Sequence, residues 1–523
     1  MDTHSLIEAL KSPQIYPDSP SQIRIAETHI SYLFFTGKYV YKVKKPVDFG
    51  FLDFTTLEKR KFFCLREVKL NSRLSPDVYL GVEEIREENG RISLGGQGKT
   101  IEYAVKMKEL PSEGMLIRLV SEGKAKPELM DRIALKIATF HREAETSNEI
   151  AGFGNVSVIK KNMQENFIQT VPYIRKTLLS IGKTLLREQY DFISERAVAF
   201  LEHKNLIFAK RKNGGMIKDC HGDLHLGAIC VEKDNIHVFD CIEFNDRFRY
   251  GDTAADIAFL TMDLEYNNRF DLSSAFTEAY IRYYEDSDIP IVLRFYKSYR
   301  AYVRGKVMSF LLDEEEVSEE QKRKALISAK GYFGLAYSYL MQPTLIIMAG
   351  LVGTGKSAVA GLLGEATGAP VVRSDEARKR LAGILPDEHR YEDYEKGIYS
   401  EEFTNKTYSE LLKEASEVLG GGRSIILDAS YKSRASRERA AALAREKGAR
   451  FFIVECICDQ KVVRARLTKR MDEMDTSDGR WEIYDRQKKE FEEITENEGR
   501  LIRIDSARSV EENMELILKV IGR

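Results

Sequence analysis

Residues 344–357 have the sequence Thr344-Leu-Ile-Ile-Met-Ala-Gly350-Leu-Val-Gly353-Thr354-Gly355-Lys356-Ser357. The first six residues are mostly apolar and predict a buried parallel strand, and the spacing of apolar residues over 358–365 predicts a helix after the stretch. Between them lies the pattern G-x-x-x-x-G-K-[ST], which needs a strand before it and a helix after it to cradle phosphate. The sequence therefore predicts a phosphate-binding loop.

Each residue type in this loop has a part in binding phosphate. The glycines let backbone N–H groups turn towards the phosphates, and the helix N-terminus adds a partial positive charge of about half an electron. Lys356 supplies a full charge, and the hydroxyl of Ser357 is a ligand for Mg²⁺. We expect the following residues to bind a nucleotide: Gly350, Gly353, Thr354, Gly355, Lys356 and Ser357.

The composition of the whole chain is that of an ordinary globular protein with several domains. Of its 523 residues, 43% are hydrophobic and 31% are charged, and the formal net charge is −2. This charge disfavours nucleic acid and anionic lipid as partners unless a local basic patch exists. The six cysteines have no paired zinc-ligand spacing, the N-terminus has no signal-like segment, and no apolar run approaches the length of a membrane span. We expect a reduced, cytoplasmic protein with no membrane partner.

The sharpest break in the chain lies at Gln342-Pro343, where a helical pattern ends and the strand of the phosphate-binding loop begins. We expect one domain over 1–341 and a second over 342–523. In the first, a small β-rich lobe over about 1–110 and a helical lobe over about 111–341 form an α+β arrangement. In the second, strands alternate with helices and predict an α/β domain with a parallel, doubly wound sheet. Its strands are expected near 344–349, 370–373, 424–428, 451–456 and 501–504.

Charged residues of the first domain follow one another in an order typical of phosphoryl transfer. Lys42 lies on an expected strand, with Lys44 on the same face, and Glu67 lies on an expected helix. Asp223 follows within a His-Gly-Asp-Leu-His motif, and Asp240 ends an apolar strand. Such a reaction needs a lysine on the phosphates and a glutamate to hold it, a carboxylate at the attacking hydroxyl, and another carboxylate on Mg²⁺.

This order of residues, over about 25–310, resembles the aminoglycoside phosphotransferase branch of the protein-kinase-like fold. The resemblance extends to Arg249-Tyr-Gly-Asp252-Thr-Ala-Ala-Asp256-Ile-Ala, which is similar to the stretch after the metal-binding aspartate in that family. It implies that Asp223 is the catalytic base and Asp240 a metal ligand. It also implies that Lys42 binds the phosphates and is held by Glu67, with Lys44 as the alternative to Lys42.

One position departs from the pattern of that family. The family usually has an Mg²⁺-binding Asn five residues after the catalytic Asp, and here that position is Ala228, whose methyl group cannot ligate a metal. Glu243, three residues after Asp240, is a candidate substitute. Either the first domain is active despite Ala228, or it is a binding or regulatory module. His141 lies on an amphipathic helical pattern, and we interpret it as a structural histidine rather than a base.

The second domain has two aspartates at the ends of expected strands, where ligands bind in α/β sheets. Asp375 is placed to accept the proton of a substrate hydroxyl. Arg378, one helical turn later, is placed to hold an anionic group of the substrate. Asp428 ends the strand over 424–428 and is expected to bind Mg²⁺ through its hydration shell.

Two arginines further along share one face of an expected helix. Arg466 and Arg470 are either solvated helix residues or, as we expect, lid residues that clamp the transferring phosphate. With the preceding motifs they resemble the small P-loop kinases of the polynucleotide-kinase, gluconate-kinase and zeta-toxin type over about 343–523. That resemblance makes Asp375 the first candidate for the general base and Asp428 the second. The order of the two domains resembles bacterial proteins described as bifunctional aminoglycoside-phosphotransferase-like/ATP-binding, a description that names folds rather than a substrate.

Our leading hypothesis is a tandem kinase with two Mg²⁺-dependent phosphotransferase domains. Each would transfer the γ-phosphoryl group of ATP or GTP to a hydroxyl of a small metabolite, sugar or nucleoside-like acceptor. The second hypothesis is a single active P-loop kinase with a catalytically impaired N-terminal module. A nucleotide-dependent switch is a third reading, which Asp375 and Arg378 weaken because a switch needs no hydroxyl base. A polynucleotide 5′-kinase is a variant of the first, weakened by the net charge of −2.

Overall fold

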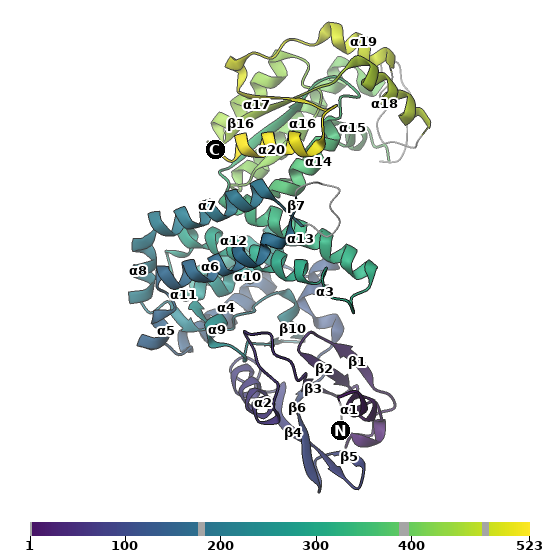
Figure 1. Ribbon diagram of the computed structural model, residues 1–523. Helices are drawn as coiled ribbons and strands as arrows, with labels where there is room; N and C mark the ends of the chain where they lie inside the picture. The colour runs from purple at the N-terminus through teal and green to yellow at the C-terminus, as the bar shows by residue number, and fades with distance from the viewer. Residues whose placement is uncertain (1–2, 176–183, 386–396, 473–480) are drawn as a thin grey trace. The chain divides into compact units, whose positions relative to one another are not determined.

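The computed structural model describes residues 3–175, 184–385, 397–472 and 481–523 (Figure 1). The chain divides into two compact units. The first consists of Met1–Lys161 and His203–Lys297, and the second of Asn162–Glu202 and Ser298–Arg523. Among the residues described, no helix combines the length and the apolar character that a membrane crossing requires.

A six-stranded antiparallel sheet forms the N-terminal part of the first unit, with strand order β1-β2-β3-β6-β4-β5. Its strands are β1 Arg24–Glu27, β2 Ser31–Phe35, β3 Tyr39–Lys44, β4 Tyr79–Glu88, β5 Arg91–Leu94 and β6 Lys99–Lys108. Side chains of β3 alternate between the two faces of this sheet. Tyr41 and Val43 pack with helix α1 (Thr3–Leu10), whereas Val40 packs with helix α2 (Leu57–Asn71). Lys42 and Lys44 therefore face α2.

The rest of the first unit is mainly helical and has two short ribbons. The ribbons pair β9 Ile217–Asp219 with β12 Tyr250–Asp252, and β10 Ile229–Glu232 with β11 Asn235–Val238. The helices are α3 Leu116–Ser121, α4 Pro127–Glu143, α5 Asn148–Gly152, α8 Asn205–Asn213, α9 Asp246–Arg249, α10 Thr253–Tyr266 and α11 Phe270–Tyr284. Short 3₁₀ turns are Pro13–Ile15, Ser112–Gly114 and Leu226–Ala228. Helix α10 is buried along nearly its whole length and packs against α11, β12 and the turn Leu226–Ala228.

A five-stranded parallel sheet of order β14-β15-β13-β16-β17 forms the core of the second unit. Its strands are β13 Thr344–Ala349, β14 Val371–Arg373, β15 Ile425–Asp428, β16 Arg450–Ile457 and β17 Arg500–Asp505. The helices around it are α14 Lys356–Thr367, α15 Ser374–Leu381, α16 Glu401–Gly420, α17 Arg434–Glu446, α18 Gln460–Asp472, α19 Trp481–Glu490 and α20 Val510–Ile521. The 3₁₀ turns are Gly397–Tyr399 and Glu496–Glu498. The doubly wound parallel sheet expected beyond residue 342 is confirmed, and each strand begins and ends within one residue of its expected range.

The second unit also contains long helices that precede the parallel sheet in the chain. They are α7 Arg187–His203 and α13 Glu319–Leu340, with parts of α6 Val156–Thr170 and α12 Ile289–Phe310; the strands β7 Ile174–Arg175 and β8 Leu185–Leu186 pair beside the 3₁₀ turn Val171–Tyr173. Gly334 of α13 lies so close to α14 that an added Cβ would be 2.2 Å from the carbonyl oxygen of Glu365. Gln189 of α7 donates to the carbonyl of Ala366 over 2.7 Å. These helices therefore pack on the C-terminal end of α14. The two units are groups of residues that pack together, and they do not mark where one fold ends and the next begins. The domain boundary expected between residues 341 and 342 therefore stays a prediction.

Candidate nucleotide sites

In the first unit, Lys42 lies between two carboxylates. Its Nζ is 2.9 Å from Oε1 of Glu67 on α2 and 2.7 Å from Oδ1 of Asp240, which follows β11. The Lys42 charge lowers the pKa of the Asp240 carboxyl. Burial acts to raise the pKa of Glu67, but the charges of Lys42 and Lys44 outweigh it and the pKa is lowered. The structure thus brings together the lysine, glutamate and metal-binding aspartate that the sequence suggested, although their roles stay predictions.

Lys44 shares the second oxygen of Glu67. Its Nζ is 2.6 Å from Oε2 of Glu67 and forms a second ion pair with Glu243, and the side chains of Lys44 and Glu67 have no exposed surface. Burial raises the pKa of Glu243 even though Lys44 acts to lower it. Lys44 therefore has a structural role beside the site. The carboxylate of Glu243, the candidate substitute for the metal-binding Asn, forms an ion pair with Lys44.

The His-Gly-Asp turn that carries Asp223 is held by backbone contacts to Asp256, at the start of α10. Oδ2 of Asp256 accepts the N–H of His221 over 3.1 Å, and Oδ1 accepts the N–H of Gly222 over 2.8 Å. His221 is buried, which lowers its pKa, and its Nε2 lies 3.0 Å from the carbonyl oxygen of Phe239. These contacts fix the turn that precedes Asp223.

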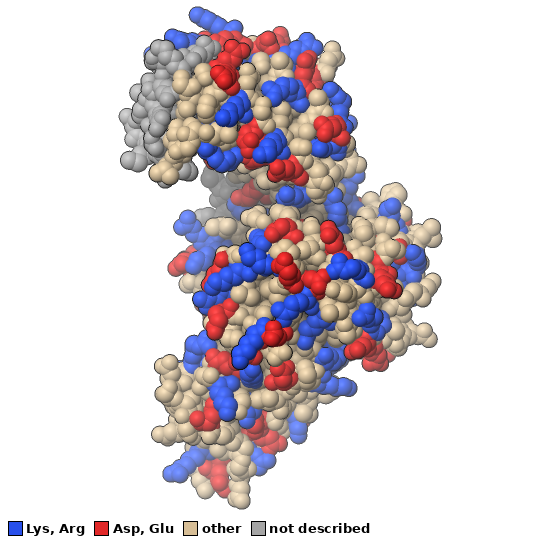
Figure 2. All heavy atoms as spheres, turned by 180° about the vertical axis from the view of Figure 1, so that it is seen from behind, with Lys and Arg blue, Asp and Glu red and all other residues tan. Residues whose placement is uncertain are grey.

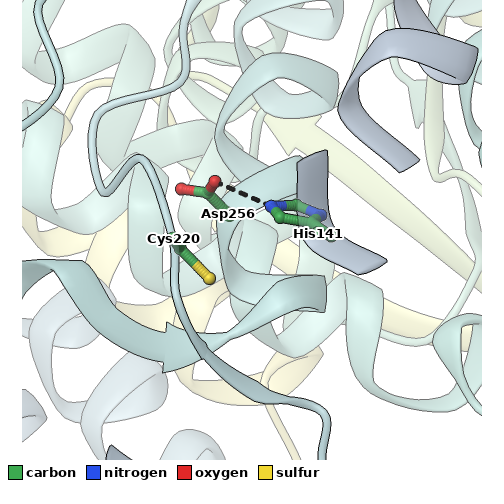
Figure 3. A group of neighbouring side chains, drawn as sticks. All are labelled: His141, Cys220 and Asp256. Atoms are coloured by element: carbon green, nitrogen blue, oxygen red, sulfur yellow. Dashed lines mark hydrogen bonds and ion pairs between the residues drawn. The ribbon is translucent and has the colours of Figure 1, made fainter. Parts of the chain in front are cut away.

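His141 of α4 continues this contact network into the core (Figure 3). Its Nε2 is 3.1 Å from Oδ2 of Asp256 and its Nδ1 is 2.7 Å from the hydroxyl of Tyr280. Ligand atoms of His141, Asp256 and Cys220 lie within 4.8 Å of one another, but Asp256 already accepts three hydrogen bonds. Burial also keeps the pKa of the Cys220 thiol well above its ordinary value. The geometry agrees with a structural histidine that orients Asp256.

Ala228 lies in the 3₁₀ turn Leu226–Ala228 and is buried. The carboxylate of Asp223 lies 3.6 Å from Nε2 of His225, and 37% of its side chain is exposed. Ala228 takes the position where the family usually has a metal-binding Asn, and its methyl group offers no metal ligand.

In the second unit, the phosphate-binding loop joins β13 to α14 as expected. Gly353 and Gly355 have φ of +78° and +84°, a region that favours glycine. The backbone conformation of the loop therefore explains why glycine occupies these two positions. The carbonyl of Leu351 accepts the hydroxyl of Thr354 over 2.7 Å and Nζ of Lys356 over 2.8 Å. Gly350 N–H donates to the carbonyl of Ser430 over 3.1 Å. The loop is thus tied to the carboxyl edge of the sheet.

The parallel register brings Asp428 and Asp375 to that same edge. Asp428 pairs with Met348 of β13 and with Arg373 of β14, and Asp375 follows Arg373 by two residues. Burial raises the pKa of Asp428, and the negative charge of Asp375 adds to the rise. The hydroxyl of Ser357 and the charge of Lys356 act to lower the pKa of Asp428.

Arg378 lies on α15 with only 10% of its side chain exposed. Its guanidinium lies 4.8 Å from the ring centre of Tyr399 and 3.5 Å from Oδ1 of Asp375. Its Nε is buried and has no hydrogen-bond partner in the described residues. A buried N–H without a partner is unfavourable, and the role of Arg378 in substrate binding stays a prediction.

Arg466 of α18 lies beside the phosphate-binding loop. Its guanidinium donates to the hydroxyl and carbonyl of Ser506 over 3.0 and 2.7 Å, and it is 3.4 Å from the place that a Cβ on Gly355 would occupy. The side chain of Arg470 lies outside the described residues. Sequence reasoning missed Gln487, whose Oε1 accepts the N–H of Val352 over 2.9 Å. No local signal marked Gln487.

Known proteins resemble either the C-terminal part of the chain or most of its length. Residues 345–494 match a family described as an AAA domain. Two uncharacterized proteins, from Mycobacterium bovis and Mycobacterium tuberculosis, are 30% identical over 452 residues, which are 86% of this chain and 86% of each relative. Among solved structures, a gluconokinase from Sinorhizobium meliloti is 19% identical, covers 35% of this chain and 94% of its own, and has a TM-score of 0.26. The APS kinase of Mycobacterium tuberculosis, in complex with AMPPNP and APS, is 19% identical over 35% of this chain and 99% of its own, with a TM-score of 0.27.

Proposed function

This chain belongs to the same family as those mycobacterial proteins, and we propose that its C-terminal domain is a Mg²⁺-dependent phosphotransferase that acts on a hydroxyl of a small molecule. One observation carries the proposal: the sheet register places Asp428, Asp375 and the phosphate-binding loop with Lys356 at the same edge. A nucleotide switch needs the loop and Asp428, whereas a phosphotransferase also needs a base for the acceptor.

The residues at this edge fit a magnesium ion. The hydroxyl of Ser357 acts on the pKa of the Asp428 carboxyl, so the two groups are neighbours, and oxygen atoms of this kind are the ligands that Mg²⁺ prefers. These two residues would hold the ion directly or through its water. A bound Mg²⁺ would neutralise charge on the β- and γ-phosphates.

The acceptor would lie beside the ion pair of Asp375 and Arg378. A carboxylate oxygen of Asp375 accepts the hydroxyl proton while the acceptor oxygen bonds to the γ-phosphorus. The bond from that phosphorus to the β-phosphate oxygen then breaks, and the nucleoside diphosphate leaves with those electrons. Lys356 and Arg466 stabilise the charge that develops on the phosphoryl oxygens. Because Arg378 is buried with its Nε unpaired among the described atoms, the acceptor should carry an anionic group such as a carboxylate or phosphate.

For the N-terminal domain we propose a second phosphotransferase site of the aminoglycoside phosphotransferase type. The ion pairs of Lys42 with Glu67 and Asp240 support this, because they already place a lysine between its holding glutamate and a metal-binding carboxylate. Asp223 would be the base. The rival candidate is a binding or regulatory module, and Ala228 favours it.

A polynucleotide acceptor is less well supported. On the face drawn in Figure 2, Lys and Arg side chains alternate with Asp and Glu, and the described residues of that face form no continuous basic surface. A groove for a nucleic-acid backbone would need such a surface.

The test is calorimetric titration of the full chain with Mg²⁺ and AMPPNP, a non-hydrolysable ATP analogue. We expect two sites per chain, one lost in Lys356→Ala and the other lost in Asp240→Asn. Lys356→Ala should also abolish turnover by the C-terminal domain, since the lysine stabilises transferring charge. Unchanged turnover in that variant would contradict the assignment. A single site that is lost in Lys356→Ala would make the N-terminal domain a module rather than a second enzyme.

A further inference from the structure

The first turn of the phosphate-binding loop is held by a side chain from a distant helix. Oε1 of Gln487, on α19, accepts the backbone N–H of Val352 over 2.9 Å. Val352 immediately precedes Gly353. The proposed chemistry does not use this contact, and Gln487 is half-buried, so its amide can be probed without removing a core residue.

Apolar packing joins the same helices to the loop. Val463 and Leu467 of α18 and Tyr484 of α19 form a buried cluster, and Leu351 and Val352 pack against it. A Cβ added to Gly353 would be 2.9 Å from a methyl group of Val463, so the loop and α18 are in close contact. We call α18 and α19 the lid helices.

The ring of Trp481 provides a signal from the lid helices. It stacks on Tyr484 at a centroid distance of 5.0 Å with an interplanar angle of 16°, and it packs against the same cluster. Trp481 is the only tryptophan of the chain. Its fluorescence therefore reports on the position of α19 without a contribution from another tryptophan.

The turn that Gln487 holds also sets the position of the loop lysine. The Leu351 carbonyl accepts Lys356 Nζ, and the N–H of the same peptide group, that of Val352, donates to Gln487. The two contacts lie on opposite sides of one peptide group, so rotation of that peptide plane would move both. Without the Gln487 oxygen, the Val352 N–H would lose its partner and the turn would no longer be fixed on the lid side.

We propose that Gln487 is a positioning residue for the nucleotide site: its amide oxygen fixes the first turn of the loop and joins the lid helices to it. The inference rests on the proposed nucleotide site of the C-terminal domain. Gln487 acts through Val352 and Lys356 and does not itself need to touch the nucleotide. Nucleotide binding at the loop then changes the position of α19 and the surroundings of Trp481.

Three variants of the full chain test this proposal. Gln487→Met keeps the length of the side chain and removes the acceptor oxygen. Gln487→Glu keeps an acceptor oxygen and adds a charge. Lys488→Met changes an exposed neighbour on the same helix and is the matched control. For each, we would measure the affinity for Mg²⁺ and AMPPNP by calorimetry, and the acrylamide quenching of Trp481 with and without the analogue.

We expect Gln487→Met to weaken the Lys356-dependent binding by about tenfold, the loss of one good hydrogen bond, and to increase quenching of Trp481 in the free protein. The analogue should change quenching in the wild type and no longer do so in Gln487→Met. Gln487→Glu should restore the quenching of the free protein, and Lys488→Met should behave as the wild type.

Two outcomes would overturn the inference alone: wild-type affinity and quenching in Gln487→Met, or the same losses in Lys488→Met. A wild-type protein with no Lys356-dependent binding would instead overturn the proposed nucleotide site. The two failures are therefore distinguishable in one set of titrations.

Discussion

The two candidate sites differ in the balance of their charges. In the N-terminal site, two lysines meet three carboxylates, those of Glu67, Asp240 and Glu243. At the phosphate-binding loop the balance is reversed, because three carboxylates lie among four cations. These residues are Asp375, Glu376, Asp428, Lys356, Arg373, Arg378 and Arg466.

This difference indicates how each site would bind a nucleoside triphosphate. The N-terminal site has an excess of negative charge before any ligand arrives, so divalent cations must accompany the phosphates. The loop site has an excess of positive charge and backbone N–H groups at a helix N-terminus, so the protein itself provides most of the attraction. The first site is built to be stable in itself, and the second is built to attract an anion.

The largest effect should come from breaking the buried ion network of the N-terminal site. Glu67→Gln removes the charge shared by Lys42 and Lys44, and we expect it to lower the free energy of unfolding of the first unit by about 3–5 kcal/mol. Urea unfolding, monitored by hydrogen exchange of the amides in the first unit, would measure this free energy. As a control, Glu320→Gln breaks the exposed pair with Lys324 and should change stability by less than about 1 kcal/mol. Equal effects of the two variants would contradict the view that the first site is held by its own charges.

A smaller effect, on binding, should follow from metal removal. With EDTA in place of Mg²⁺, we expect the N-terminal site to lose about hundredfold in ATP affinity and the loop site about tenfold, because only the first has excess negative charge. Calorimetry on Lys356→Ala isolates the first site, and calorimetry on Asp240→Asn isolates the second. Equal losses at both sites would remove the distinction between them.

The smallest effect should be seen in the pH dependence of the loop site. Burial raises the pKa of Asp428, and this carboxyl must be ionised to hold Mg²⁺. Because the pKa is raised, the proton binds at a higher pH than for an ordinary aspartate. We therefore expect kcat/KM to fall about tenfold per pH unit as the pH drops below this raised value. In Asp428→Asn the residual kcat/KM should no longer fall in this way as the pH drops. An unchanged fall in that variant would show that another group causes it.

The sequence predicted those parts of the sites in which the signal is local. The strand, glycine loop and helix around Lys356 are contiguous, and Gly353 and Gly355 have the backbone conformations that their spacing indicated. The pair of Lys42 and Glu67 was also expected, because strand periodicity placed Lys42 on one face and a family pattern supplied the partner.

The parts that the sequence did not predict depend on contacts between distant segments. Gln487 lies 135 residues after Val352, and Asp256 holds the turn at Gly222 from 34 residues away. No periodicity or spacing links such residues, because only the packed fold brings them together. Lys44 is a similar case: its partner Glu243 follows 199 residues later, so the strand pattern alone left open which lysine faces the phosphates.

The crossing of α13 and α14 at Gly334 limits how freely the parallel-sheet module can be transplanted. Tyr337 of α13 is fully buried and stacks on Phe192 of α7 at 4.1 Å, beside the end of the chain at Gly522. A gene fragment that begins at residue 342 would encode the sheet and the loop but would expose this surface to water. In evolutionary terms, we expect the part of the gene that can move as one piece to be larger than the segment that the P-loop motif delimits.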